Sequence, residues 1–368
     1  MRARQREKLR ATLKGRLIVP GESSYESARR VFYWNPTTER SPVAIVQCGH
    51  EDDVLRAVEF ARAQALEVSV RSGGHSHLAW GSSNGLVIDL SPLKQITIDP
   101  KKRLVRAQAG ALSGEVARVA AAHGLVPVLG QCPGVSATGV MLGGGLGWLS
   151  GLFGACCDNL LSARLVTADA RTVEVTAETD PDLLWAMRGA GANFGVTTQF
   201  EARLQSIGTV LGGDLHFAVR DARAVLCGFR ELMHDAPDGF QATLNLTPGE
   251  RGIFLSLCHT GKEKEADDLL GKLRSLAPPI REAVQRQPSA RSRRSTGSAS
   301  PMRRPFPTAK LTPSTCAPPT AGATRRTTRS DSRGARNGCA CCAPCPTRAS
   351  TPTTRPMRPR PDHRRCLA

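Results

Sequence analysis

Arg71-Ser72-Gly73-Gly74-His75-Ser76 follows directly on a strand predicted at residues 66–70 and is the first of two glycine-containing motifs in the chain. Two adjacent glycines let main-chain N–H groups converge on an anion without an intervening Cβ, and the two serines add hydroxyl donors. The pattern is therefore a candidate cradle for a pyrophosphate. It lacks the Gly-x-Gly-x-x-Gly order and the following helix of a dinucleotide-binding βαβ unit, which leaves a simple turn as the alternative.

A second glycine-rich stretch lies between residues 130 and 149. It begins with Gly130-Gln131-Cys132-Pro133 and ends with Leu142-Gly143-Gly144-Gly145-Leu146-Gly147-Trp148-Leu149. Such glycine density permits close approach of the backbone to a flat or phosphorylated ligand. Tight turns in a crowded core need the same residues, so the sequence leaves both interpretations open. Phe153-Gly154 and Asp158-Asn159 follow this stretch.

Short apolar segments alternate with helical ones from residue 42 to about 205. The spacing of apolar residues predicts strands at 42–48, 66–70, 86–90 and 103–110, helices at 51–64, 112–124 and 180–190, and a hairpin over 163–176. Asp180 is expected to cap the last of these helices, with Pro181 in its first turn. Leu184, Trp185 and Met187 lie on that helix and are expected in the core rather than around a substrate.

The pattern changes after residue 206. Strand, helix, strand, strand and helix follow one another to about residue 276. This order is typical of a smaller α+β domain whose sheet needs more strands to bury its face. No further strand is predicted beyond that point.

The last part of the chain differs in composition from the rest. Of 368 residues, 40% are hydrophobic and 22% charged, which excludes collagen-like, coiled-coil and wholly disordered classes for the chain as a whole. Residues 286–368, however, hold 13 of the 25 prolines, 18 Lys and Arg, and only two acidic residues, so they carry +16 of the formal charge of +18. We expect disorder there. Residues 286–368 have three possible interpretations: an Arg-rich interaction tail, a low-complexity linker or the product of translation out of frame. We favour the last.

Taken together and in order, these segments resemble the berberine-bridge-enzyme-like branch of the FAD-linked oxidases, in the vanillyl-alcohol oxidase superfamily. The resemblance runs from about Leu9 to Ser275 and includes Val87-Ile88-Asp89-Leu90 and the run at 184–196. It implies an α+β fold with a two-part FAD-binding domain at residues 1–205. An incomplete α+β substrate domain at 206–285 and the tail at 286–368 would follow.

The resemblance also implies roles for single residues. In the family, the histidine of the glycine loop bonds to the 8α carbon of the flavin, which selects His75, and a neutral imidazole nitrogen suits that bond. In many members the cysteine of Gly-x-Cys-Pro bonds to flavin carbon 6, which selects Cys132, whose thiolate is a soft nucleophile. The alternatives are a loop histidine that only forms a hydrogen bond, and a buried, inert thiol. The remaining expected FAD contacts are Arg71, Ser72, Gly73, Gly74, Ser76, Gly143, Gly144, Gly145, Gly147, Asp158, Asn159, Gly195 and Val196.

Two positions depart from the family pattern. Gly151-Leu152 stands where members usually carry an arginine or lysine, and Ser136 follows Val135 where members often have glycine. Both departures put the detailed flavin contacts in doubt.

The general base of the family, commonly Tyr or Glu, comes from the later part of the substrate domain and must lie within hydrogen-bond reach of its proton. The only tyrosines, Tyr25 and Tyr33, precede the first of the strands predicted above, so no catalytic base is named. His77 is expected only to pack or form a hydrogen bond, and Cys156 and Cys157 to be small core residues.

The resemblance implies an FAD-dependent oxidase that takes hydride from a carbinol or amine carbon of a small molecule, with oxygen reoxidising the covalently bound flavin. The alternatives are an inactive, truncated FAD-binding remnant and an Arg-tailed nucleic-acid-binding protein. The charged start at residues 1–10 is followed by no apolar signal region, and no run approaches the roughly 20 apolar residues of a membrane span. We therefore expect a cytoplasmic chain without a membrane partner. We also expect no bound metal, because the cysteines at 339–345 match no paired zinc-binding spacing.

Overall fold

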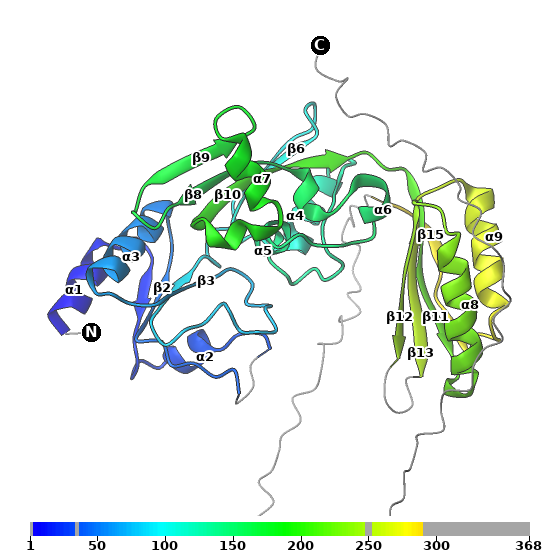
Figure 1. Cartoon of the computed structure of the whole chain (residues 1–368), viewed down its shortest axis with the longest axis horizontal. Coiled ribbons are helices and arrows are strands. Elements are labelled where there is room, and N and C mark those ends of the chain that lie inside the picture. Colours follow the sequence, from blue (N-terminus) through cyan, green and yellow to red (C-terminus); the bar gives the residue numbers. More distant parts are fainter. Residues whose placement is uncertain (1–2, 34–36, 247–251, 290–368) are drawn as a thin grey trace, which may run out of the picture. The chain divides into compact units, whose positions relative to one another are not determined.

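The computed structural model describes residues 3–33, 37–246 and 252–289, all within one compact unit of the chain (Figure 1). They form three β-sheets with helices packed against them. The predictions for residues 290–368 lie outside the described residues, including the cysteines at 339–345.

The first sheet carries the 71–76 loop at its edge strand. Its strand order is β1-β2-β4-β3, with β2 and β3 both parallel to β4 and β1 antiparallel to β2. The central strands β2 and β4 are almost entirely buried, as expected for parallel strands covered on both faces. The elements of this part are α1 (Ala3–Thr12), β1 (Arg16–Ile18), α2 (Tyr25–Arg29), β2 (Ala44–Gln47), α3 (Glu51–Ala63), β3 (Val68–Arg71) and β4 (Leu86–Asp89).

The second sheet is antiparallel and has the order β5-β6-β10-β8-β9, with β7 paired to β10. Its core is shared with helices α4, α5 and α7, whose apolar residues pack on the sheet. The expected hairpin is confirmed as β8 and β9, and the Asp180 carboxylate caps α7 by accepting from Leu183 N at 3.0 Å. The elements are β5 (Ile96–Asp99), β6 (Leu104–Gln108), α4 (Ser113–Ala121), β7 (Val126–Pro127), α5 (Ala137–Leu142), α6 (Ser150–Phe153), β8 (Leu160–Val166), β9 (Thr172–Thr176), α7 (Pro181–Ala190) and β10 (Val196–Gln205).

The third sheet has the order β12-β13-β11-β14, and β15 also pairs with β11. Figure 1 shows α8 and α9 along one face of this sheet, and the apolar residues of that face form a core with both helices. The elements are β11 (Thr209–Phe217), α8 (Ala222–His234), β12 (Phe240–Leu246), β13 (Ile253–His259), α9 (Glu263–Arg274), β14 (Arg281–Glu282) and β15 (Gln285–Pro288).

Strands β14 and β15 correct the expectation that no strand follows residue 276. Their sequences, Arg-Glu and Gln-Arg-Gln-Pro, have no apolar alternation, so periodicity missed them. They join the sheet through main-chain hydrogen bonds to β11, which do not require apolar side chains. Three of the residues in β15 belong to the stretch that composition assigned to the tail.

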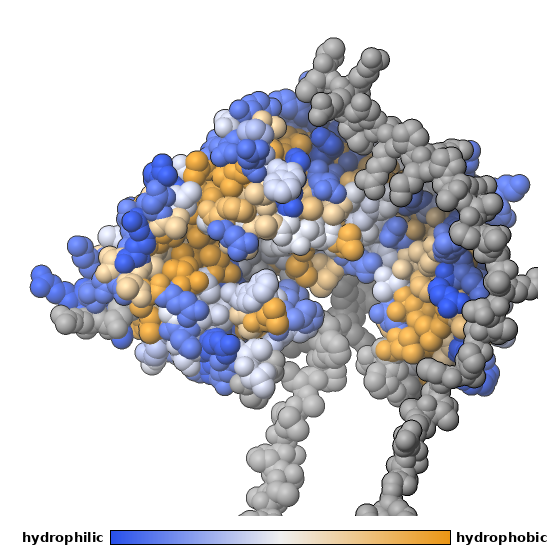
Figure 2. Space-filling view, viewed as in Figure 1, coloured by the Kyte–Doolittle hydropathy of each residue, from blue (hydrophilic) through white to orange (hydrophobic). Residues whose placement is uncertain are grey.

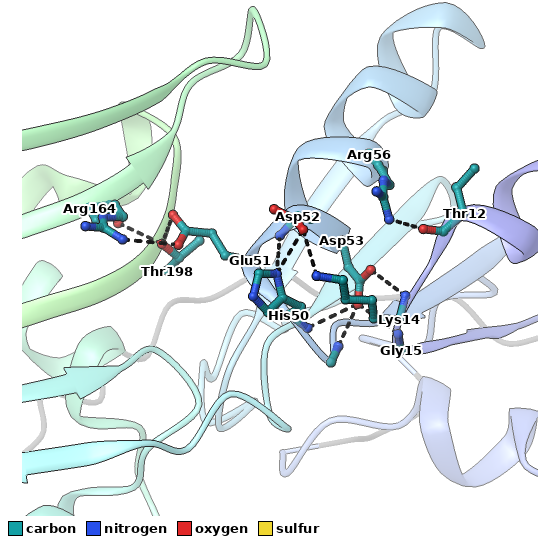
Figure 3. A network of polar contacts seen from close by, with 11 residues as sticks. Thr12, Lys14, Gly15, His50, Glu51, Asp52, Asp53, Arg56, Arg164 and Thr198 are labelled. Carbon is teal, nitrogen blue, oxygen red and sulfur yellow. Dashed lines mark hydrogen bonds and ion pairs between the residues drawn. The ribbon is translucent and has the colours of Figure 1, made fainter.

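A buried carboxylate ties β1 to the start of α3 (Figure 3). Asp53 is fully buried and accepts hydrogen bonds from the main-chain N–H groups of Lys14, Gly15, Gly49 and His50 at 2.8 to 3.2 Å. These donors precede β1 and follow β2. One side chain therefore satisfies four N–H groups that would otherwise lack acceptors.

The same helix end contacts the second sheet. Glu51 accepts from Thr198 Oγ1 at 3.2 Å and pairs with Arg164 at 3.4 Å (Figure 3). Thr198 lies in β10 and Arg164 in β8, so Glu51 links the start of α3 to the second sheet.

The visible surface is mixed in character. Figure 2 shows hydrophilic residues over α1 and a group of hydrophobic residues beside α8. Within the described ranges, no helix is both long and apolar enough to cross a membrane.

Candidate functional site

The hexapeptide at 71–76 starts from a buried ion pair. Arg71 ends β3 and lies beside Asp89 at the end of the neighbouring parallel strand β4. The guanidinium is 3.0 Å from the carboxylate, and the two side chains are only 8% and 4% exposed. Gln47 Nε2 donates to the same carboxylate at 3.3 Å. This pair fixes the first residue of the loop, so Arg71 anchors the loop to the sheet.

The loop presents main-chain donors without partners. The N–H groups of Gly73, Gly74, His75 and Ser76 donate to no described residue. A cavity of about 210 Å³ lies beside this loop and is lined by Arg71, Ser72, Gly73 and Gly74 together with Phe32 and Gln47. Successive N–H groups that point into a concave surface are a known form of anion site. The arrangement fits the phosphates of a dinucleotide.

The two glycine-rich stretches meet at one carbonyl group. The Ser72 and Ser136 hydroxyls both donate to the carbonyl oxygen of Ala109, at 2.7 and 3.2 Å. A Cβ on Gly73 would lie 2.8 Å from Ser136 N, closer than real Cβ atoms approach. The contact therefore requires glycine at position 73 and brings the loop against the segment that follows Cys132.

His75 lies between this segment and an aromatic ring. A Cβ on Gly134 would come 3.7 Å from His75 Nε2, and the ring of Phe32 stacks on the imidazole at 4.0 Å between centroids. Burial, and to a smaller extent the charge of nearby His77, lowers the pKa of His75 below its ordinary value. The imidazole is therefore held in its neutral, nucleophilic form near pH 7.

Cys132 is exposed in the described structure. The alternative of a buried, packing thiol is therefore wrong for this residue, and a bound ligand can reach its sulfur. Its neighbour Gln131 donates from Nε2 to the Thr243 hydroxyl of β12 at 3.3 Å. The cysteine thus stands where the second glycine stretch contacts the third sheet.

The glycines at 143–147 differ in how tightly the surrounding chain packs against them. A Cβ on Gly147 would lie 1.9 Å from the carbonyl oxygen of Leu129, and one on Gly145 would lie 2.4 Å from Val140 Cγ1, so chain packing alone requires both. Gly143 ends α5, and Gly144 has open space around its Cβ position. Packing therefore explains Gly145 and Gly147, whereas Gly143 is exposed and Gly144 is half-buried with free space beside it.

The other expected contacts have structural partners. Asn159 is buried and donates from its amide to the carbonyls of Phe153 and Ala155 at 3.0 Å each. Asp158 accepts from Ala155 N at 2.8 Å. Val196 packs in the core of the first sheet, next to Val166 of β8.

Gly195 is also accounted for by packing. It has a φ of +150°, and a Cβ there would lie 2.6 Å from the carbonyl oxygen of Val166. Contact of Gly195, Val196, Asp158 and Asn159 with a cofactor stays a prediction.

Both departures from the family pattern have a physical reason in this chain. A Cβ on Gly151 would lie 2.2 Å from the carbonyl oxygen of Asp238 and 2.6 Å from Gln241 Nε2, so no larger residue fits there. Ser136 caps α5, because its hydroxyl accepts from Gly139 N at 3.2 Å. Each substitution thus serves a local contact of this molecule.

A second cavity lies between Trp148-Leu149 and the third sheet. It measures about 330 Å³ and is lined by residues of β11, β13 and β15. Asp214 and Ser256 lie on the sheet face that α8 and α9 leave free, and the serine hydroxyl donates to the carboxylate at 2.5 Å. Only one oxygen of Asp214 is engaged within the described part of the chain, so the other can accept from a ligand.

Sequence reasoning missed the aromatic residues beside the loop. Phe32 and Tyr33 precede the expected strands, yet they stack on His75 and His77 respectively. Trp185 is 75% exposed, which corrects the expectation of a core position, whereas its neighbours Leu184 and Met187 are buried as expected. Trp185 is on the outer side of α7, and a residue count along the helix did not resolve this.

Comparison with known proteins agrees with the geometry. A family profile described as an FAD binding domain matches residues 42–176, which contain both glycine-rich stretches. An FAD-linked oxidoreductase of Aspergillus terreus is 32% identical over 282 residues, 74% of this chain and 57% of that protein. (R)-6-hydroxynicotine oxidase of Paenarthrobacter nicotinovorans is 30% identical over 280 residues, 74% of this chain and 61% of that protein.

Solved structures show the same fold. The crystal structure of 6-hydroxy-D-nicotine oxidase from Arthrobacter nicotinovorans superposes with a TM-score of 0.72 at 29% identity, covering 76% of this chain and 63% of that one. BBE-like 1 of Physcomitrella patens gives 0.70 at 26% identity, covering 77% and 62%. The chain therefore spans about three-fifths of the length of these relatives. The α+β architecture with a vanillyl-alcohol-oxidase-type FAD-binding domain is confirmed.

Proposed function

Because the chain belongs to the berberine-bridge-enzyme-like family of FAD-linked oxidoreductases, we propose that it carries covalently bound FAD and oxidises a carbinol or amine carbon of a small molecule. When bound, FAD accepts hydride from that carbon, and oxygen reoxidises it. The remaining chemistry is the work of this chain's residues: they hold the cofactor, attach it and present the substrate.

The observation that carries the proposal is the row of N–H groups at 73–76 that have no acceptor among the described residues, in the loop that also carries the His75 imidazole. Donors of this kind suit the pyrophosphate of a dinucleotide. Arg71 is engaged with Asp89 and so acts as an anchor of the loop rather than as the main phosphate ligand.

His75 and Cys132 are the two proposed attachment points, His75 for the 8α carbon and Cys132 for carbon 6. Support comes from their accessibility and from the Ala109 carbonyl, which ties together the two loops that carry them. The cysteine requires its thiolate, and the histidine its neutral form.

The substrate is proposed to occupy the cavity of about 330 Å³ beside Trp148. The free oxygen of Asp214 can accept a hydrogen bond from the hydroxyl or amine group of the molecule to be oxidised. We also propose that residues 206–285 form the partial substrate domain, since the third sheet begins at Thr209. The six cysteines of the described residues are all free, which supports a cytoplasmic setting.

The test uses the full chain, saturated with FAD and then precipitated with acid. Flavin that stays with the denatured polypeptide is expected in the unaltered protein. His75→Ala and Cys132→Ala are each expected to retain one linkage and the double variant none, while Cys227→Ala, which removes another exposed thiol, retains both. Peptide mass spectrometry then assigns each bond. Flavin that is fully released from the unaltered chain contradicts covalent attachment, and failure to bind any FAD contradicts the function itself.

A further inference from the structure

Phe32 is attached at two points to the loop that carries His75. Its ring stacks on the imidazole with 4.0 Å between centroids and 15° between planes. Its main-chain N–H donates to the carbonyl oxygen of Gly74 at 3.1 Å. The hydrogen bond fixes the backbone of Phe32 against the loop, and the stacking then fixes the plane of the imidazole.

Among the described residues, no other group determines that plane. Neither ring nitrogen of His75 forms a hydrogen bond within the described ranges. Tyr33 meets the imidazole only edge-on, at 6.1 Å and 89°, and stacks instead on His77 at 3.9 Å. An imidazole without hydrogen bonds usually rotates about its side-chain bonds, so the stacked phenyl ring is what restrains His75.

Resting on the covalent attachment of FAD proposed above, we propose that Phe32 is the positioning residue for flavin attachment, because it holds His75 in the orientation from which a ring nitrogen bonds to the 8α methyl carbon. His75 forms the nitrogen–carbon bond and loses its N–H proton, and one methyl C–H bond breaks. The two electrons pass through the flavin ring to oxygen, which leaves as hydrogen peroxide with both protons. Phe32 itself takes no part in the bond changes.

The phenyl ring also affects the protonation of His75. Burial is the main cause of the lowered pKa of His75, and the like charge of His77 is the second. Tyr33 faces the histidine from the same segment as Phe32, and Arg71 is engaged in its buried pair. Removal of the phenyl ring exposes the imidazole, so its pKa rises toward the ordinary value and a larger fraction is protonated near pH 6.

The experiment follows the formation of acid-stable flavin with time after flavin-free full-length chain is mixed with FAD. Phe32→Ala is expected to slow it about tenfold per molecule of bound FAD, the kinetic equivalent of one aromatic pair, and the rate is normalised to bound FAD because Phe32 also lines the cavity beside the loop. In Phe32→Ala, the midpoint of the dependence of the attachment rate on pH is expected to move to higher pH. Phe32→Tyr preserves the stacking and is expected to restore the rate. Tyr33→Leu, the matched control in the same segment, is expected to leave it nearly unchanged.

A second measurement needs no flavin. Diethyl pyrocarbonate modifies neutral, accessible imidazoles, and tandem mass spectrometry separates His75 from His77. Faster modification of His75 in Phe32→Ala, with Phe32→Tyr unchanged, supports the positioning role. Equal modification, or attachment of flavin at the unaltered rate in Phe32→Ala, overturns it. An unaltered chain whose His75 is shielded by Phe32 but which never retains acid-stable flavin overturns the covalent attachment, and the attachment role of Phe32 with it.

Discussion

The guanidinium of Arg71 lies 3.0 Å from the carboxylate of Asp89, where two neighbouring parallel strands end side by side. The pair occupies the base of the 71–76 loop and is almost fully removed from solvent. Since each charge depends on the other, the conformation of the loop depends on both residues.

Loss of either partner is expected to destabilise the protein and to weaken FAD binding by the 71–76 loop. Asp89→Asn leaves a buried guanidinium without its counter-charge, which costs about 3 to 5 kcal/mol in the free energy of unfolding. Thermal unfolding followed by circular dichroism measures the effect. Arg71→Ala is expected to show a similar loss together with weaker FAD binding. Unchanged melting of both variants would show that the pair contributes nothing to the fold.

Asp53→Ala is expected to separate β1 from α3. Four main-chain N–H groups lose their acceptor, and the cost is about 3 kcal/mol or more, since each charge-assisted bond contributes about 1.5 to 3 kcal/mol. Asp52→Ala is the matched control, because that neighbouring carboxylate is half-exposed and pairs with Lys14 at the surface. Denaturant midpoints of the two variants are compared. Equal midpoints would contradict the role given to Asp53.

Restoration of the family's basic residue at position 151 is expected to harm this chain. In Gly151→Arg the new Cβ meets the carbonyl of Asp238, and overpacking of this kind costs about 1 to 3 kcal/mol. Gly271→Ala serves as the comparison, because its Cβ enters open space in α9 and is expected to stabilise by about 0.5 to 1 kcal/mol. The melting temperature is expected to fall in Gly151→Arg and to rise in Gly271→Ala, relative to the unaltered protein. A stabilised Gly151→Arg would refute the close contact.

Thiol labelling is expected to divide the cysteines by exposure. In flavin-free protein at pH 8, Cys132 and Cys227 are exposed and react first with a maleimide. Burial raises the pKa of Cys156 and of Cys258 to about 11, so both stay protonated and react slowly. Quantitative peptide mass spectrometry gives the rate at each site. Labelling of Cys156 as fast as that of Cys132 would contradict the burial of Cys156.

Much of the fold was accessible from the sequence because its strands are apolar and its helices are amphipathic. The strands at 44–47 and 86–89, the helix at 51–63 and the hairpin of β8 and β9 follow from periodicity alone. By contrast, α1 is made almost entirely of polar residues, and β14 and β15 are held by backbone pairing. Elements of this kind leave no periodic signal.

The sequence predicted the glycines of the candidate site but not the residues that surround them. Gly73 and His75 belong to a recognisable motif, whereas Phe32, which stacks on His75, lies 43 residues earlier in the sequence and outside any motif. The Ala109 carbonyl carries no side-chain signature at all. The division of the chain at residue 205 and the cofactor contacts of single residues stay predictions.

The shared acceptor at Ala109 couples the positions of the two glycine-rich stretches. One carbonyl oxygen sets the separation between the serine that precedes Gly73 and the serine that follows Val135. A substitution that shifts one hydroxyl is therefore expected to shift the other, and with it the loop of His75 or the segment that follows Cys132. If FAD is attached at both residues as proposed, strain at one carbon–heteroatom bond would be passed to the other.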